Sequence, residues 1–225
     1  MKKRILGVLL ASLFLLSGCS AQSPELIKAG EDTVSAATRS RYRANEIDQY
    51  QGARLDPAIG PRDNSIKGIQ QVDTASYALS IGGLVDRSLS LSYDEVRVLD
   101  AHERLITLYC VEGWQATILW KGVLLGELIA MAGAKPEAVT VIFGSVDGYT
   151  TSLPLQTIKD KALILAYSAN GLDLPPAMGY PFIVVAEDKL GYKWARWVNS
   201  ITLSDDANYK GFWEQAGYSN EAEVP

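Results

Sequence analysis

Histidine and cysteine are scarce in this chain of 225 residues, which contains one His and two Cys. A zinc hydrolase needs several His or Cys ligands, and a Ser or Cys hydrolase needs a base, most often a His, beside its nucleophile. The single His102 lies eight residues before Cys110, and we interpret it as a solvated loop residue. Gly-rich phosphate-binding loops of the two common spacings are also absent. These absences argue against most hydrolases and nucleotide-binding enzymes.

Long apolar runs are scarce as well. The run from Ile5 to Leu16 follows three basic residues, and it is too short for a permanent membrane span, which needs about 20 residues. It ends at a lipoprotein cleavage box, residues 16–19. We therefore predict that residues 1–18 are a lipoprotein signal peptide and that Cys19 carries acyl chains that anchor the protein to a membrane. An uncleaved anchor and a plain secretory signal are the alternatives.

Beyond the leader, composition predicts a tether and one domain. Residues 19–49 are small and polar, and we expect a lipid-anchored tether with at most one marginal helix. Residues 50–225 are long enough for a single domain with its own core. The expected location is the cell envelope, periplasmic or on the outer surface. The formal net charge is −5, so we do not expect nucleic acid as a partner.

Strand-like runs dominate the domain, and helices are short. Ser92 to Glu95 matches a capping box that begins one helix, a second helix is expected to end at Gly133, and Asn170-Gly171 predicts a hairpin turn. Residues 50–73 are expected to form an ordered loop around the domain, with a disordered extension of the tether as the alternative. Together these features predict a mixed α+β fold. The strands are expected at residues 77–85, 105–111, 115–119, 139–146, 162–166, 182–186 and 194–203.

Cys110 has no partner for a disulfide once Cys19 is lipidated. Three interpretations compete, namely an inert buried side chain, a reactive nucleophile and a metal ligand. A nucleophile lacks a nearby base, and a thiol redox protein lacks a resolving cysteine. A metal that brings its own ligand set and takes one thiolate from the protein remains possible.

Short motifs around and after Cys110 occur in a fixed order. Together they resemble the sulfite-oxidase-type molybdenum enzymes, over roughly residues 60 to 218. The resemblance implies a strand-rich, single-domain molybdopterin-binding fold. The motifs are Tyr77 to Val85, Cys-Val-Glu-Gly-Trp from Cys110, Leu119 to Val123, Asp147 to Leu155, Leu165 to Tyr167, Gly179-Tyr180-Pro181 and Gly191 to Val198.

The closest branch is the bacterial one that includes catalytic subunits of protein-methionine-sulfoxide reductases. The sulfite-oxidising branch has a basic cluster after its cysteine, whereas residues 111–114 here are Val, Glu, Gly and Trp. The resemblance therefore implies oxygen-atom transfer at molybdenum with a sulfoxide-type substrate rather than sulfite. We do not expect a counterpart of the C-terminal dimerisation domain of eukaryotic members, because residues 211–214 lie close to the end of this sequence.

The resemblance also implies site residues. Cys110 would bind molybdenum, which a pyranopterin monophosphate carries on two dithiolene sulfurs. Tyr149 would donate a hydrogen bond or a proton near the metal, with core packing as its alternative. Asp147 would orient a donor, although an Asp in such a turn more often binds its own backbone.

Three further residues are candidates for holding the cofactor. Arg196 and Lys193 are the candidates for the cofactor phosphate, which needs cationic side chains, and surface charge is the alternative. Asn64 would contact the pterin, with a turn as its alternative.

Partners and an alternative function follow from the same residues. We expect a small-molecule or protein-bound oxo substrate, a haem protein as electron partner, and the membrane through the lipid anchor. The leader has Lys2-Lys3-Arg4 without a twin-arginine pattern, although molybdenum cofactor is normally inserted before export. A cofactor-free, lipid-anchored binding module on the same scaffold is therefore the alternative to an enzyme.

Overall fold

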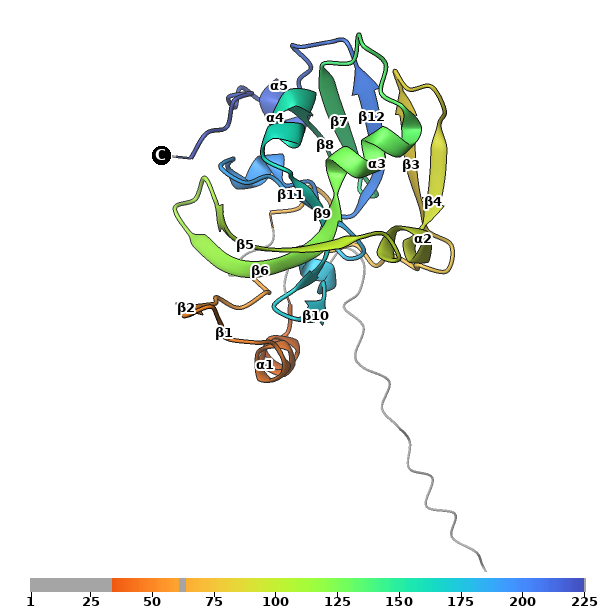
Figure 1. Ribbon diagram of the computed structural model, residues 1–225. Helices are drawn as coiled ribbons and strands as arrows, with labels where there is room; N and C mark the ends of the chain where they lie inside the picture. Colours follow the sequence, from red (N-terminus) through yellow and green to blue (C-terminus); the bar gives the residue numbers. More distant parts are fainter. Residues whose placement is uncertain (1–33, 61–63, 225) are drawn as a thin grey trace, which may run out of the picture.

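A computed structural model describes residues 34–60 and 64–224 of the chain (Figure 1). The predicted signal peptide, Cys19 and most of the predicted tether lie outside these residues, so they stay predictions. Within the described part, no helix is both long and apolar enough to cross a membrane.

Two five-stranded sheets and a small hairpin carry the fold. In the first sheet all the pairings are antiparallel, in the order β10-β9-β6-β5, with β11 also paired to β9. Its strands are β5 (Ala101–Tyr109), β6 (Gln115–Leu124), β9 (Ile164–Ala169), β10 (Leu172–Asp173) and β11 (Ile183–Val185). Figure 1 shows β5 and β6 as a long curved hairpin.

The second sheet is mixed, in the order β4-β3-β12-β7-β8, and only the pair of β3 with β12 is parallel. Its strands are β3 (Ala78–Gly83), β4 (Leu89–Ser92), β7 (Thr140–Ser145), β8 (Thr150–Pro154) and β12 (Val198–Ser204). The small hairpin pairs β1 (Gln49–Tyr50) with β2 (Ala53–Arg54). The helices are α1 (Ala36–Asn45), α2 (Tyr93–Arg97), α3 (Leu125–Ala132), α4 (Leu155–Asp160) and α5 (Phe212–Gln215), with 3₁₀ turns η1 (Pro176–Met178) and η2 (Gly191–Lys193).

One hydrophobic core joins the two sheets. Trp120 of β6 and Phe143 of β7 are both fully buried members of the same cluster. The Trp120 ring packs 5.6 Å from that of Trp194, and its indole N–H donates to the carbonyl of Ile106 (3.1 Å). Because the sheets share this core, the described residues form one domain, as the sequence predicts.

Several local predictions are confirmed. Ser92 and Glu95 form both hydrogen bonds of a capping box at the start of α2. Gly133 ends α3 in the left-handed conformation, with φ 71°. Asn170 and Gly171, with φ 49° and 81°, turn β9 into β10.

Other expectations were wrong. His102 lies within β5 rather than in a loop. The last strand begins at Val198, because residues 191–193 form η2 and Trp197 has a positive φ of 51°. Short strands β1, β2, β4, β8 and β10 were not predicted as strands.

Part of the segment assigned to the tether packs against the domain. Val34 is buried, and so is the carboxylate of Glu46, which accepts hydrogen bonds from the Ala58 N–H (2.8 Å) and the Asn170 side-chain amide (3.1 Å). Arg39 of α1 also donates to the Gly60 carbonyl (2.6 Å). The packed domain therefore includes α1, whereas the sequence placed its start at residue 50.

Candidate active site

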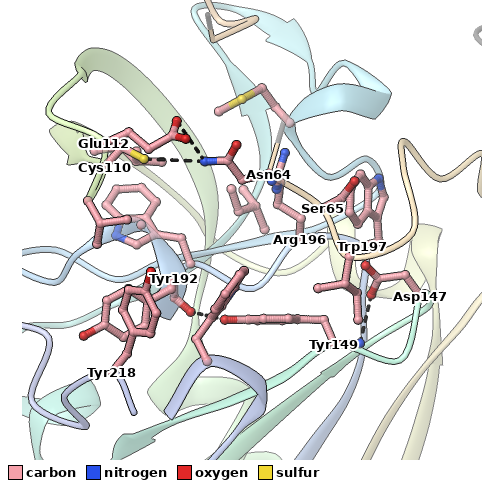
Figure 2. Close-up of a pocket in the computed structure, with 18 of the residues that line it drawn as sticks. Asn64, Ser65, Cys110, Glu112, Asp147, Tyr149, Tyr192, Arg196, Trp197 and Tyr218 are labelled. Carbon is pink, nitrogen blue, oxygen red and sulfur yellow. Dashed lines mark hydrogen bonds between the residues drawn. The ribbon is translucent and has the colours of Figure 1, made fainter. Parts of the chain in front are cut away.

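A cavity of about 400 Å³ lies beside Cys110 (Figure 2). Its walls come from the loop before β3, the turn between β5 and β6, the turn between β7 and β8, the segment from η1 to Trp197, and the C-terminal segment. Its size is in the range of pockets for drug-sized ligands. The lining residues are Asn64, Ser65, Ile66, Leu108, Cys110, Val111, Glu112, Trp114, Asp147, Tyr149, Met178, Ile183, Gly191, Tyr192, Trp194, Arg196, Trp197, Trp213 and Tyr218.

A tight turn presents the Cys110 thiol at this cavity. The Cys110 N–H donates to the Trp114 carbonyl (2.9 Å), and the Gly113 N–H donates back to the Cys110 carbonyl (3.0 Å). Gly113 has a positive φ of 84°, which glycine adopts without strain. The thiol is partly exposed. Burial raises the pKa of the thiol. A hydrogen bond from the Glu112 backbone opposes this shift, the Glu112 carboxylate adds to it, and the Arg196 charge opposes it.

Asn64 and Glu112 lie next to the thiol, as Figure 2 shows. The Asn64 side-chain amide nitrogen is 3.6 Å from the Cys110 sulfur and donates to the Glu112 carboxylate at 3.3 Å. The Trp114 indole N–H donates to the same carboxylate oxygen at 3.3 Å. Asn64 is therefore brought to the site as predicted. Glu112 was not predicted as a site residue, although its position two residues after the thiol could have indicated it.

Asp147 and Tyr149 form the turn between β7 and β8. The Asp147 carboxylate is buried and accepts from the Tyr149 N–H (3.0 Å), while Gly148 between them has φ 89°. Asp147 thus fixes the backbone of Tyr149 through a local turn. The Tyr149 hydroxyl donates to the backbone carbonyl of Tyr192. Burial strongly raises the pKa of Tyr149, and the Glu214 charge adds to this.

Arg196 faces the cavity, and its position is fixed by neighbouring groups. Its guanidinium donates to the Ala177 carbonyl (2.8 Å) and lies 5.1 Å from the centre of the Trp197 ring. The Trp197 indole N–H donates to the Pro176 carbonyl (2.8 Å). Because Gly179 has no side chain, Arg196 can pack against its backbone; a Cβ there would lie 2.8 Å from the Arg196 Cβ.

Lys193 is not brought to the cavity. Its ammonium is fully buried and donates to Glu214, to the Asn220 side-chain oxygen (2.8 Å) and to the Ser152 carbonyl (3.1 Å). These three acceptors match its three N–H donors. Of the two predicted phosphate-binding cations, only Arg196 lines the cavity.

The aromatic side chains of the wall that were not predicted as site residues include a cluster of three, Tyr192, Trp213 and Tyr218. The Tyr218 ring lies 5.3 Å from each of the other two, and both pairs meet edge to face. Trp213 and Tyr218 come from a C-terminal segment that carries no motif in the sequence. Only tertiary packing places them at this site.

The side chains that line the cavity have the chemistry needed to bind a molybdopterin. The cavity wall offers two soft sulfur atoms, the Cys110 thiol and the Met178 thioether, and of these Cys110 can give the thiolate that binds transition metals. Arg196 supplies a fork of donors suited to a phosphate, and Asn64 supplies an amide. Aromatic walls then give the apolar surround that cofactor pockets share.

Comparison with known proteins identifies the class. Residues 66–213, more than half of the chain, match the family described as "Oxidoreductase molybdopterin binding domain". The protein therefore belongs to this family of molybdopterin oxidoreductases, and the predicted enzyme class and cofactor class are confirmed.

Among the relatives, the "Uncharacterized oxidoreductase YuiH" of Bacillus subtilis is 35% identical over 147 residues, covering 65% of this chain and 74% of that protein. The "Putative protein-methionine-sulfoxide reductase subunit YedZ1" of Azospira oryzae is 30% identical and covers 93% of this chain and 82% of its own length. Among solved structures, the sulfane dehydrogenase SoxCD of Paracoccus pantotrophus matches with a TM-score of 0.62 at 19% identity, covering 86% of this chain. This chain spans 57% of that SoxCD chain, and the likeness confirms the fold alone.

Proposed function

We propose that the protein transfers an oxygen atom at a molybdenum bound by Cys110, and that its substrate is a sulfoxide-type compound rather than sulfite. The observation that carries the proposal is the Cys110 sulfur in the wall of the cavity, with the Asn64 amide 3.6 Å away. When bound, the molybdopterin supplies a two-electron redox centre at which an oxygen atom is removed from or added to a substrate.

The residues of the chain would hold and orient the cofactor. Cys110 would give the thiolate, and Arg196 would bind the phosphate through charge-assisted hydrogen bonds. Asn64, which already donates to Glu112, would contact the pterin or a group on the metal.

Tyr149 and Asp147 have separate roles in this proposal. The Tyr149 hydroxyl, which donates to the Tyr192 carbonyl, would hold its proton at the edge of the cavity and could turn to donate toward a substrate oxygen. A tyrosine hydroxyl is protonated at neutral pH in any case, and burial moves the pKa of Tyr149 further above it. Asp147 acts through Tyr149 as a positioning residue, because its carboxylate fixes the Tyr149 backbone.

Charge at the cavity supports a neutral substrate. The charged side chains among the described lining residues are Glu112, Asp147 and Arg196, which are two acids and one base. An anion such as sulfite would meet an excess of negative charge, whereas a sulfoxide would not. Two relatives bear names that agree with this, YedZ1 and the "Protein-methionine-sulfoxide reductase catalytic subunit MsrP" of Xanthomonas axonopodis, the second at 27% identity.

Metal and pterin analysis tests the proposal. Full-length protein purified from the envelope of its own cells should carry about one molybdenum and one pterin per chain, and Cys110→Ala should lose the metal. Ser90→Ala, at an exposed position of β4, is the control and should keep it. Protein without metal, made alongside a known molybdoenzyme that does load, would favour the cofactor-free binding module.

Turnover then tests the substrate. Loaded protein should reduce methyl p-tolyl sulfoxide with a reduced dye as electron donor. Loaded protein that oxidised sulfite and left sulfoxides unchanged would refute the substrate assignment. The electron partner, proposed to be a haem protein, and the lipid anchor to the envelope would be sought by pull-down and by mass spectrometry of Cys19.

A further inference from the structure

A buried polar network lies behind one wall of the cavity. The side chains of Lys193 and Glu214 are both fully buried, and their charged groups are 2.5 Å apart. Thr151 of β8 donates to the same Glu214 oxygen (2.7 Å), and Asn220 accepts from Lys193 (2.8 Å). The network thus ties η2, β8 and the C-terminal segment together.

Such a pair is poorly explained by stability alone. Removing two charges from water costs about as much as their attraction returns, so a buried ion pair contributes little net stability compared with apolar residues. Burial lowers the pKa of Lys193, and Glu214 opposes this shift. Within the described residues the second Glu214 oxygen has no hydrogen-bond partner, which adds to the cost. Such a network can instead fix the positions of the segments that it joins, here η2, β8 and the C-terminal segment.

Each C-terminal group in the network lies close in sequence to a ring of the cavity wall. Trp213 immediately precedes Glu214, and Tyr218 lies two residues before Asn220. Both rings line the cavity. Their segment is also fixed at Gly211, where a Cβ would lie 2.2 Å from the Thr150 carbonyl oxygen.

On the η2 side, too, a network residue is next in sequence to a ring of the cavity wall. Tyr192, which immediately precedes Lys193, lines the cavity and donates through its hydroxyl to the Ser219 carbonyl (2.7 Å). In Figure 2 the Tyr192 and Tyr218 side chains lie together, away from Asn64 and Arg196. Loss of one group of the network would therefore displace the aromatic wall formed by Tyr192, Trp213 and Tyr218.

We propose that Lys193 is a positioning residue that holds the C-terminal segment, residues 211–220, as the substrate-facing aromatic wall of the cavity. Trp213 and Tyr218 would then select substrates by the shape and apolarity of their substituents, while Arg196 and Cys110 hold the cofactor. The selectivity part rests on the proposed function, but the placement of the wall does not.

Tryptophan fluorescence tests the placement in the full-length protein. Lys193→Met keeps an unbranched side chain, shorter by the one nitrogen atom, and removes its charge. It should shift the emission of Trp213 to longer wavelength as the ring meets water. The shift should be absent when Lys193→Met is made in a Trp213→Phe background. Lys161→Met is the matched control, because Lys161 also pairs at 2.5 Å, with Asp188, but is exposed. Unchanged Trp213 emission would refute the proposal.

Kinetics of the loaded enzyme test the role. Lys193→Met should raise the KM for methyl p-tolyl sulfoxide by about tenfold, since a wall displaced by an ångström costs that much or more. The kcat at saturation and the molybdenum content should change less than about twofold. A lower melting temperature with an unchanged KM would mean a merely structural pair and would overturn the proposal. Loss of pterin without a change in Trp213 emission would assign Lys193 to cofactor binding and would also overturn it.

A milder variant covers the case in which Lys193→Met fails to fold. Glu214→Gln keeps a carbonyl acceptor for Lys193 and Thr151 but replaces the second carboxylate oxygen by an NH2 donor and removes the charge. It should give the same red shift of Trp213 emission and the same rise in KM, both at smaller size. Unchanged emission and KM in Glu214→Gln would count against the proposal. If the unsubstituted protein reduces no sulfoxide, the proposed function fails, and the fluorescence result still decides the placement.

Discussion

Replacing Arg196 by Ala should weaken cofactor binding by roughly 10- to 100-fold. Among the described residues, Arg196 is the one Lys or Arg that lines the cavity. A hydrogen bond to a charged group contributes about 1.5–3 kcal/mol, and each 1.4 kcal/mol is about tenfold in a dissociation constant. Its bond to the Ala177 carbonyl and its place over Trp197 hold the guanidinium ready for a phosphate, so little ordering cost is expected to offset this contribution.

Reconstitution measures this loss directly. Cofactor-free protein would be titrated with molybdopterin released from a purified molybdoenzyme, and bound pterin would be read by fluorescence after oxidation. Arg196→Lys keeps the charge without the fork of donors, so its pterin affinity should lie between that of Arg196→Ala and that of the unsubstituted protein. Arg87→Ala, at an exposed position, should bind like the unsubstituted protein. Unchanged pterin affinity in Arg196→Ala would show that the guanidinium does not bind the phosphate, and the phosphate role would be withdrawn.

Three further predictions concern separate parts of the chain. Glu46→Ala should lower the free energy of unfolding by about 3 kcal/mol, because the buried Ala58 N–H loses its acceptor; urea unfolding measures this, and an unchanged midpoint would contradict it. In cofactor-free protein the pKa of Cys110 is raised by burial. Alkylation of the thiol, followed by mass spectrometry, should therefore be slow at pH 7 and accelerate only above the ordinary thiol pKa of about 8.5. An alkylation rate already maximal at pH 7 would refute the raised pKa. Tyr149→Phe leaves the Tyr192 carbonyl without its donor and should lower kcat with pterin retained; full kcat would remove the proposed role of the hydroxyl.

Local rules predicted the parts of the fold that local contacts determine. The capping box at Ser92, the glycine stop at Gly133 and the Asn170-Gly171 turn each depend on a few neighbouring residues. Strand β8 was missed because its residues 150–154 show no clear alternation, being buried on both faces at Thr151 to Leu153. The pairing with β7 that makes it a strand is set by the turn at Asp147 and is not visible in composition.

At residues 194–197 the error is the opposite one, because a strand was predicted where none forms. Trp194, Ala195 and Trp197 are apolar, and their run with the following residues predicts a strand. Trp197, however, adopts a left-handed backbone conformation, and its N–H donates to the Gly179 carbonyl (3.2 Å). Ladder pairing with β7 and β3 begins only at Val198 or later. The aromatic residues are there to fill the core and the cavity wall rather than to form the sheet.

Motif order predicted which residues of the candidate site meet. Asn64, Cys110, Tyr149 and Arg196 lie far apart in the sequence and line one cavity. Lys193 was assigned to the same cavity because it shares a motif with Arg196. Successive side chains of a 3₁₀ turn point in different directions, however, and the side chain of Lys193 points into the protein interior. Trp213 and Tyr218 could not be predicted, since no local pattern links the C-terminus to the thiol.

The three residues of η2 each contact a different wall of the site. Gly191 packs its backbone against the Cys110 loop, where a Cβ would lie 3.4 Å from the Tyr109 carbonyl oxygen and 3.8 Å from the Cys110 Cα. The Tyr192 carbonyl accepts from Tyr149, and Lys193 pairs with Glu214 of the C-terminal segment. One short turn therefore sets the thiol loop, the tyrosine hydroxyl and the aromatic wall relative to one another. Because these contacts share η2, substitutions at Tyr149 and Lys193 should not be additive, as is general for residues joined by one rigid contact network.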